Sequence, residues 1–209
     1  MPHLVLLGDS VFDNGAYTGR EPEVIEHLRS VLPADWQATL AAVDGATTAG
    51  LPSQVRRVPA DATHLVVSVG GNDALRHLDL LHLPVASTAE ALALFDERAT
   101  RFEADYREAL GSVLALGLPT TVCTIYNGNL EDREEARLAR VALMIFNDAI
   151  LRVALEHRLG IIELRLVCSE PGDYANPIEP SGQGGWKIAR AIAEAAGAAG
   201  VATDRRSLA

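Results

Sequence analysis

Three polar segments follow apolar runs in the first third of the chain, and their side chains have the types needed for acyl transfer. Asp9 and Ser10 follow "HLVLLG", Gly45 lies in "VDGATTAG" after the second run, and Asn72 lies in "SVGGNDAL" after the third. A serine at a strand-to-helix turn can act as a nucleophile, because backbone N–H groups and the helix dipole there favour developing negative charge. An asparagine amide can stabilise an oxyanion without adding a titrating group.

Each of these residues also has a purely structural interpretation. Asp9 or Ser10 can cap the next helix, Gly45 can form an ordinary turn, and Asn72 with Asp73 can cap the helix after the third run. The chain contains no GxxxxGK[ST] motif and no GxGxxG after the first apolar run, so the turns are not of the phosphate-binding types.

The elements that must position these residues alternate along the chain. Apolar runs typical of strands covered on both faces occupy 3–7, 37–43, 63–69, 119–125 and 160–167, and helical patterns occupy 21–32, 87–117, 130–160 and about 184–198. This alternation predicts an α/β fold, a three-layer α/β/α sandwich around a five-stranded parallel sheet. Ligands bind such sheets beyond the carboxyl ends of the strands, where the polar segments lie.

Composition narrows the possible functions. The chain has 209 residues, 48% of them hydrophobic, and a net charge of −10, so we predict one domain over 1–209 and exclude nucleic acid as a partner. The first apolar run has only five residues and no basic segment precedes it, which predicts a cytoplasmic protein without a membrane span. Cys123 and Cys168 lack CxxC spacing and are expected to be buried, reduced thiols.

Taken in order, these segments resemble the SGNH (GDSL-type) hydrolase family. "GDS" ends the first run, Gly45 follows the second, "GGND" ends the third, and "EPSGQGGWKIA" resembles the family's last block. The form "GDSVFDNGAY" is similar to the lipase and acylhydrolase branch. The resemblance covers essentially the whole chain and implies the flavodoxin-like SGNH fold. It also implies hydrolysis of a small-molecule ester or thioester without a metal or cofactor.

The resemblance also implies roles for individual residues. Ser10 would be the nucleophile, and its own N–H, the Gly45 N–H and the Asn72 amide would form the oxyanion hole. We further expect the substrate to contact four residues near these turns and near the last block, together with a crevice after the first, third and fourth strands. The four residues are Asp9, which also fixes the turn, Phe12, Asn14 and Asn176, and the crevice adds Leu75, Tyr126 and Asn127.

The last block departs from the family at the catalytic base. Family members carry an Asp and a His separated by two residues, whereas "NPIEPSGQGG" places Asn176 at the Asp position and Glu179 at the His position. Pro180 fixes this register together with the paired glycines 184–185. Three alternatives follow: Glu179 is the base, His77 supplies the base from the segment after the third strand, or the site binds a ligand without hydrolysing it.

We predict that Glu179 is the base. A carboxylate with the ordinary pKa of about 4.3 is a weak base at neutral pH, but burial would raise that pKa and strengthen it as a proton acceptor. Neutral Asn176 would then orient Glu179 by hydrogen bonding. A flavodoxin-like or response-regulator-like module is disfavoured, because the phosphate loop and the acidic pocket with a downstream Lys are missing. An inactive binding protein with the same fold is the remaining alternative.

Overall fold

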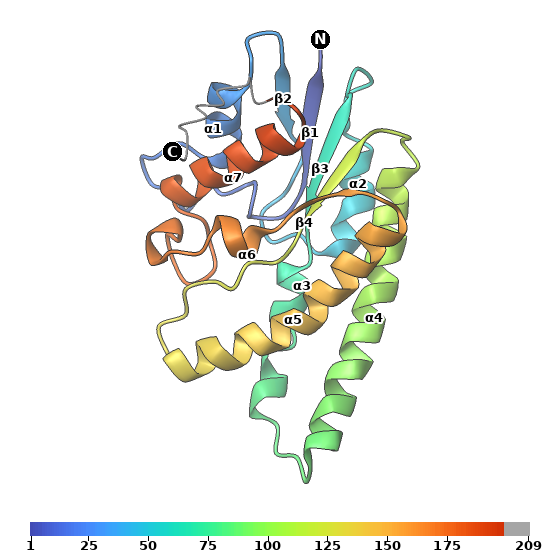
Figure 1. Ribbon diagram of the computed structural model, residues 1–209, viewed down its shortest axis with the longest axis vertical. Helices are drawn as coiled ribbons and strands as arrows, with labels where there is room; N and C mark the ends of the chain where they lie inside the picture. The colour runs from blue at the N-terminus through green and yellow to red at the C-terminus, as the bar shows by residue number, and fades with distance from the viewer. Residues whose placement is uncertain (199–209) are drawn as a thin grey trace, which may run out of the picture.

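The computed structural model describes residues 1–198, which form a single parallel sheet flanked by helices (Figure 1). Its five strands lie in the order β2-β1-β3-β4-β5, and every neighbouring pair is parallel. The predicted α/β class and sheet are therefore confirmed. The strands are β1 (His3–Gly8), β2 (Gln37–Leu40), β3 (His64–Ser68), β4 (Thr120–Cys123) and β5 (Gly160–Ile162).

One face of the sheet is covered by α1 (Val24–Val31), α6 (Leu164–Val167) and α7 (Gly182–Ala195) (Figure 1). Helices α1 and α7 pack on each other, and their apolar side chains enclose a core with the alternate residues of β1 that point to this face. Helix α1 begins later than its pattern predicted, because Glu23 is the N-cap and forms a capping box with Glu26.

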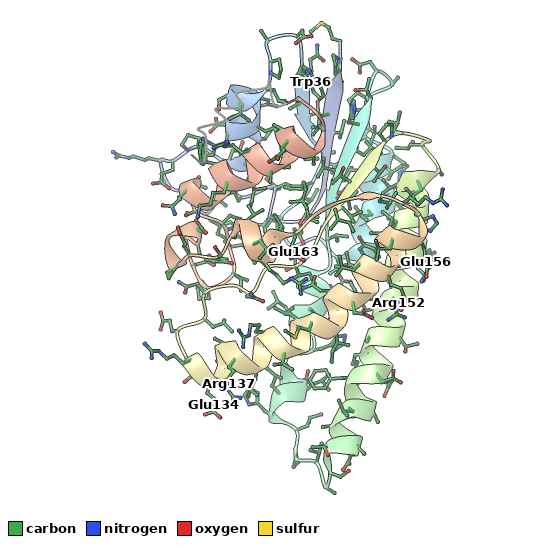
Figure 2. All side chains as sticks on the ribbon, in the orientation of Figure 1. Trp36, Glu134, Arg137, Arg152, Glu156 and Glu163 are labelled. Atoms are coloured by element: carbon green, nitrogen blue, oxygen red, sulfur yellow. The ribbon has the colours of Figure 1, made fainter. Side chains whose placement is uncertain are left out.

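The opposite face is covered by α2 (Leu51–Val55), α4 (Thr88–Leu114) and α5 (Arg133–Glu156). Two ion pairs join α4 and α5: Arg107 binds Glu156 at 2.6 Å, and Glu103 binds Arg152 at 2.9 Å. Arg107 and Glu103 are also paired within α4, at 2.7 Å. Figure 2 shows Arg152 and Glu156 on the part of α5 that lies beside α4. These ion pairs hold the C-terminal parts of the two helices together beside the sheet. The N-terminal halves of the helices do not take part in these ion pairs.

Those N-terminal halves extend past the carboxyl edge of the sheet (Figure 1). No residue of α4 is buried before Phe102, and Ala139 is the one buried residue of α5 before Phe146. The short helix α3 (Gly71–Leu75) and the 3₁₀ segment η2 (Leu78–His82) lie beside them. The carboxyl edge is therefore bordered by apolar helix surfaces that do not belong to the main core.

The strands are shorter than the predicted runs, and the largest difference is at the last run. The run over 160–167 is not one strand, because β5 ends at Ile162 and Leu164–Val167 form α6. The Glu163 side chain accepts a hydrogen bond from the Arg165 N–H and thereby starts that helical turn. Cys123 and Cys168 are both free and buried, as predicted. None of the helices in residues 1–198 is long and apolar enough to cross a membrane.

Candidate active site

Ser10 lies two residues beyond Gly8, the last residue of strand β1, at the carboxyl end of that strand. The chain turns at Gly8, whose φ is +132°, and the Asp9 N–H then donates to the Ser68 carbonyl of β3 at 3.0 Å. Ser10 is only 7% exposed, and its N–H makes no backbone hydrogen bond within residues 1–198. The turn therefore presents both the hydroxyl and a free N–H of Ser10 at the sheet edge.

Glu179 contacts Ser10 across the site, although 169 positions separate them in sequence. The Ser10 hydroxyl donates a 3.0 Å hydrogen bond to Oε1 of Glu179, and Glu179 is only 5% exposed. Its other oxygen, Oε2, is buried without a hydrogen-bond partner in the described part of the chain. Burial raises the pKa of Glu179, the negative charge of Asp44 raises it further, and the Ser10 hydrogen bond lowers it.

Three hydrogen bonds to the main chain hold the loop that carries Glu179. The Ala175 N–H donates to the Glu179 carbonyl at 2.8 Å, and the Tyr126 hydroxyl donates to the Ile178 carbonyl at 2.5 Å. Oδ1 of Asn176 accepts from the Glu179 N–H at 2.9 Å. Asn176 therefore orients the backbone of Glu179 and not its carboxylate, which differs from the sequence-based expectation.

The loops after β2 and β3 bring two further donors to the same edge. Gly45 adopts φ +72°, which favours glycine, and its N–H makes no backbone hydrogen bond in residues 1–198. The Asn72 amide donates one hydrogen to the Ala46 carbonyl at 2.9 Å, which leaves its second hydrogen available. Asp73 accepts from the Thr48 hydroxyl at 2.7 Å and ties the two loops together.

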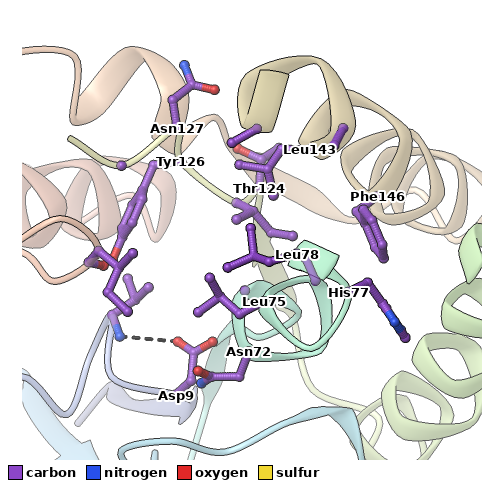
Figure 3. Close-up of a pocket in the computed structure, with 18 of the residues that line it drawn as sticks. Asp9, Asn72, Leu75, His77, Leu78, Thr124, Tyr126, Asn127, Leu143 and Phe146 are labelled. Carbon is purple, nitrogen blue, oxygen red and sulfur yellow. Dashed lines mark hydrogen bonds between the residues drawn. The ribbon is translucent and has the colours of Figure 1, made fainter. Parts of the chain in front are cut away.

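A pocket with a volume of about 110 Å³ opens beside Ser10 and Glu179. Figure 3 shows Asp9, Asn72 and Tyr126 at one end of it and Phe146 with His77 at the other. His77 stacks on the Phe146 ring with centroids 6.3 Å apart, and it makes no hydrogen bond to Ser10. The structure thus brings Glu179, and not His77, to the Ser10 hydroxyl.

Asp9 is a second buried carboxyl at the end of the pocket where Ser10 lies. It is 3% exposed, and its Oδ1 accepts from the Val11 N–H at 3.1 Å, the dashed line in Figure 3. Burial raises the pKa of Asp9 to about 8, and the charges of Glu179 and Asp73 add to this effect. No group of three or more His, Cys, Asp or Glu within residues 1–198 is arranged to hold a metal ion.

The whole of this arrangement lies within one family match. The model of the GDSL-like lipase/acylhydrolase family matches residues 6–187, a span that includes Ser10, Gly45, Asn72 and Glu179. The chain belongs to the GDSL-like lipase/acylhydrolase family. It is therefore an ester-hydrolysing enzyme of the GDSL type.

Solved structures of GDSL-type and related enzymes share this fold at low sequence identity. The chain is similar to an extracellular lipase from Streptomyces rimosus, with 14% identity, a TM-score of 0.67 and coverage of 93% of this chain and 100% of that one. It is also similar to a lipase/acylhydrolase from Enterococcus faecalis (17%, TM-score 0.61, 93% and 94%). A catalytic mutant of an acetylxylan esterase from Geobacillus stearothermophilus matches similarly (19%, TM-score 0.62, 94% and 94%). None of the curated proteins compared with the chain matches it.

Two residues of this GDSL-type enzyme that we expected to contact the substrate have no exposed surface. Phe12 is buried in the core beneath α1 and α7. Asn14 is also fully buried, accepts from the Val24 N–H at 3.0 Å and donates to the Pro180 carbonyl at 3.2 Å. Their positions argue for structural roles instead, with Asn14 joining the turn after β1 to the Glu179 loop. Leu75, Tyr126 and Asn127 do line the pocket as predicted.

Gln54 is a positioning residue that the sequence-based reasoning missed. Its side-chain oxygen accepts from the Gly8 N–H at 2.7 Å, and its amide donates to the Gly8 carbonyl at 2.7 Å. Gln54 is buried, and its two hydrogen bonds connect it to a residue 46 positions earlier in the sequence. They hold the turn that precedes Ser10. The surrounding sequence, "LPSQV", gives no indication that this glutamine makes such a contact.

Replacing Gln54 by Met is expected to destabilise the fold by about 2–4 kcal/mol, because the buried Gly8 N–H loses its acceptor. The kcat for p-nitrophenyl butyrate should also fall, since the Ser10 turn is no longer fixed. Urea unfolding and steady-state kinetics measure the two effects. Ser53→Ala on the same helix removes an exposed hydroxyl bond to Gly50 and is the control. Equal behaviour of the two variants would contradict the positioning role.

Asp9 is expected to make stability fall as pH rises. The pKa of Asp9 is about 8 in the folded state and 3.8 as its ordinary value, so the folded state holds its proton more strongly. The resulting loss of stability grows between about pH 4 and pH 8 and is constant above that range. Asp9→Asn keeps the acceptor for the Val11 N–H and removes the titration.

Urea unfolding at pH 5 and pH 8.5 should therefore show a growing advantage for Asp9→Asn over the wild type. We expect the difference to reach about 2–5 kcal/mol at the higher pH. Asp13→Asn is the matched control, because Asp13 also accepts a hydrogen bond from a backbone N–H, that of Asp44, but is only half-buried. A difference that is the same at both pH values would show that Asp9 does not titrate in this range.

Proposed function

We propose that this GDSL-type enzyme is a serine esterase or acylhydrolase in which Ser10 is the nucleophile and Glu179 is its general base. The observation that carries this proposal is the 3.0 Å hydrogen bond from the Ser10 hydroxyl to a buried carboxylate with a raised pKa. A base must lie within hydrogen-bond reach of the proton it removes, and Glu179 meets that requirement.

In the first half of the reaction, the Ser10 proton passes to Oε1 of Glu179 as Oγ forms a bond to the ester carbonyl carbon. The carbonyl oxygen takes the negative charge, and the N–H groups of Ser10 and Gly45 together with the second Asn72 hydrogen stabilise it. The alcohol then leaves with the proton from Glu179, which produces an acyl-Ser10 ester.

The second half repeats these steps with water. Glu179 removes a proton from the water as its oxygen attacks the acyl carbon. Ser10 Oγ is the leaving group and recovers that proton, so the acid is released and the enzyme is regenerated. Removing one oxyanion donor from such a site costs about 10²–10³ in kcat, which is the contribution expected of Asn72.

Glu179 acts as a base only when it is ionised, so hydrolysis should fall as pH drops through its pKa. Because burial raises that pKa, the acid limb of kcat/KM should lie above the ordinary value for a glutamate, about 4.3. The position of this limb is measured with p-nitrophenyl butyrate from pH 4 to pH 9.

A covalent label tests the nucleophile directly. A fluorophosphonate reacts with an activated serine hydroxyl, fluoride leaves, and a phosphonyl–serine ester remains. We expect mass spectrometry to locate the added mass on the peptide that contains Ser10, with loss of hydrolysis in proportion to labelling. Protection by an ester substrate and no label in Ser10→Ala would support the proposal. A folded protein that neither reacts nor hydrolyses esters would favour the inactive binding protein.

A further inference from the structure

The pocket beside Ser10 changes character along its length. Figure 3 shows Asp9 and Asn72 at one end and His77 with Phe146 at the far end. Glu179 also lines the pocket, where it accepts the hydrogen bond from Ser10. The walls between are supplied by α3, η2, α4 and α5, and neither Lys nor Arg is among the residues of 1–198 that line the pocket. Its apolar wall is formed mainly by Leu75, Leu78, Leu81, Phe95, Ala142 and Leu143.

We propose that this pocket binds the acyl group of the substrate and accepts an uncharged straight chain of about four to six carbons. Ala142 on α5 sets the width of the pocket. The proposal rests on the proposed function, because it concerns which esters Ser10 attacks. It distinguishes an enzyme for short aliphatic acyl groups from one for acetyl groups, a distinction that the family alone does not make.

The order of the chemical steps favours the acyl group over the alcohol as the occupant. The acyl group stays on Ser10 through both half-reactions, whereas the alcohol must leave before water can attack. A pocket between helices suits the group that stays. Asp44 and Gly45, which lie near Glu179 and outside the pocket lining, are exposed, so the alcohol has an open route there.

The distribution of charge favours an uncharged chain. The carboxyls of Asp9 and Glu179 border the pocket, and no Lys or Arg side chain from the described part of the chain lines it. A free carboxylate at the far end of the acyl group would lose its hydration in the apolar part of the pocket without gaining an ion pair. Succinyl and other anionic acyl groups should therefore be poor substrates.

The volume and the far wall limit the length of the chain. A dry cavity of about 150 Å³ accepts benzene, which has six carbons, so the 110 Å³ pocket has room for about four to six. Phe146 closes the far end and is fixed there, because it is 3% exposed and packs edge-to-face on Phe102 with centroids 5.3 Å apart. Longer chains must leave the pocket or displace this core ring.

The test compares two neighbouring positions on α5. Ala142 lines the pocket, whereas Val141 is 53% exposed and does not line it. Ala142→Phe places an aromatic ring in the pocket, and Val141→Phe places the same side chain on the outer surface as the control. Both variants and the wild type are assayed with p-nitrophenyl esters from acetate to decanoate.

In the wild type, kcat/KM should rise about fourfold for each added methylene up to about hexanoate and then stop rising. The ratio of hexanoate to acetate hydrolysis should fall at least tenfold in Ala142→Phe and should stay within threefold of the wild type in Val141→Phe. The half-ester of succinate should react at least tenfold more slowly than butyrate, which has the same chain without the second carboxylate.

Three results would overturn the inference. In the first, acetate is the best substrate and each methylene lowers kcat/KM. In the second, Ala142→Phe and Val141→Phe give the same chain-length profile. In the third, the rise appears when the alcohol of an acetate ester is lengthened and not when the acyl chain is lengthened, which would assign the pocket to the alcohol.

A binding measurement separates this inference from the proposed mechanism. In Ser10→Ala, which cannot form the acyl-enzyme, 2-alkanones from butanone to decanone supply an uncharged carbonyl with an alkyl chain. The melting temperature should rise with chain length up to about six carbons, and this rise should be absent when Ala142→Phe is added. If the alkanones bind in this way but the wild type hydrolyses no ester, the proposed mechanism is wrong and the assignment of the pocket to the acyl chain is supported. If the wild type hydrolyses esters but the alkanones do not bind in this way, the mechanism stands and the assignment of the pocket is wrong.

Discussion

Hydrolysis of p-nitrophenyl butyrate is expected to fall about 10⁴-fold or more in Ser10→Ala and about 10³-fold in Glu179→Gln, with the double variant no worse than Ser10→Ala. Residues that act on one proton transfer are not additive, because the base has nothing to activate once the nucleophile is absent. The glutamine amide keeps the shape of the side chain but cannot accept the Ser10 proton. The measurement is kcat and KM for all three variants and the wild type.

Non-additivity is the informative part of this experiment. If Glu179 only packed against the site, its substitution would lower activity by the same factor with and without the Ser10 hydroxyl. Residual rates must be read above the uncatalysed reaction, and circular dichroism must show that each variant is folded. Multiplicative losses would mean that Glu179 is not the partner of Ser10.

A base exchange provides an independent control. Asn176→Asp with Glu179→His restores the family's pattern in the last block, and the acid limb should then move to about 6.5. Glu179→His alone should be less active, because no carboxylate orients the imidazole. If the limb is the same in the wild type and the double variant but disappears in His77→Ala, the base is His77.

The fold was predictable from sequence because each strand is a nearly continuous apolar run followed by polar turn residues. Such runs are the signature of strands covered on both faces, and their carboxyl ends meet at one edge. Ser10, Gly45 and Asn72 could be assigned to that edge for this reason. Glu179 follows no apolar run and was assigned only by the resemblance of the last block to the family, 169 positions after Ser10. The local sequence pattern thus predicts that the residues after the strands lie at this edge, but it does not predict the contacts that their side chains make there.

Other features depend on contacts between segments distant in sequence, which no local pattern reveals. Gln54 reaches Gly8 through two side-chain hydrogen bonds, and a buried polar residue of this kind looks like any surface glutamine in the sequence. Asn176 was expected to orient the Glu179 carboxylate, but its short side chain forms a local turn and accepts from the Glu179 N–H instead.

The same limitation explains the error in the last apolar run. Residues 160–167 read as one strand, yet Glu163 accepts hydrogen bonds from the Thr124 hydroxyl of a neighbouring segment and from Arg165. These bonds favour a helical turn over continuation of the strand, so Leu164 enters α6 and is buried there. Tertiary contacts therefore override a local preference for extended backbone.

Gly8→Ala is expected to destabilise the fold severely, with a loss of more than about 4 kcal/mol in the free energy of unfolding. A Cβ at Gly8 would lie 1.8 Å from the Ser68 carbonyl oxygen, and the φ of +132° is one that alanine rarely adopts. The clashing atom is backbone in the neighbouring strand β3, so it can move only if the sheet moves. Urea unfolding measures the loss.

Gly19→Ala separates the clash from the backbone conformation. Gly19 also has positive φ, +66°, but a Cβ there would meet no atom within 4 Å, so its substitution should cost only about 1–2 kcal/mol. The excess in Gly8→Ala is then the cost of forcing β1 and β3 apart at the turn that carries Ser10. Equal losses would mean that the turn can relax, and the folded fraction of Gly8→Ala should then retain hydrolysis. A large excess would instead mean that the close approach of two strands fixes the position of the nucleophile.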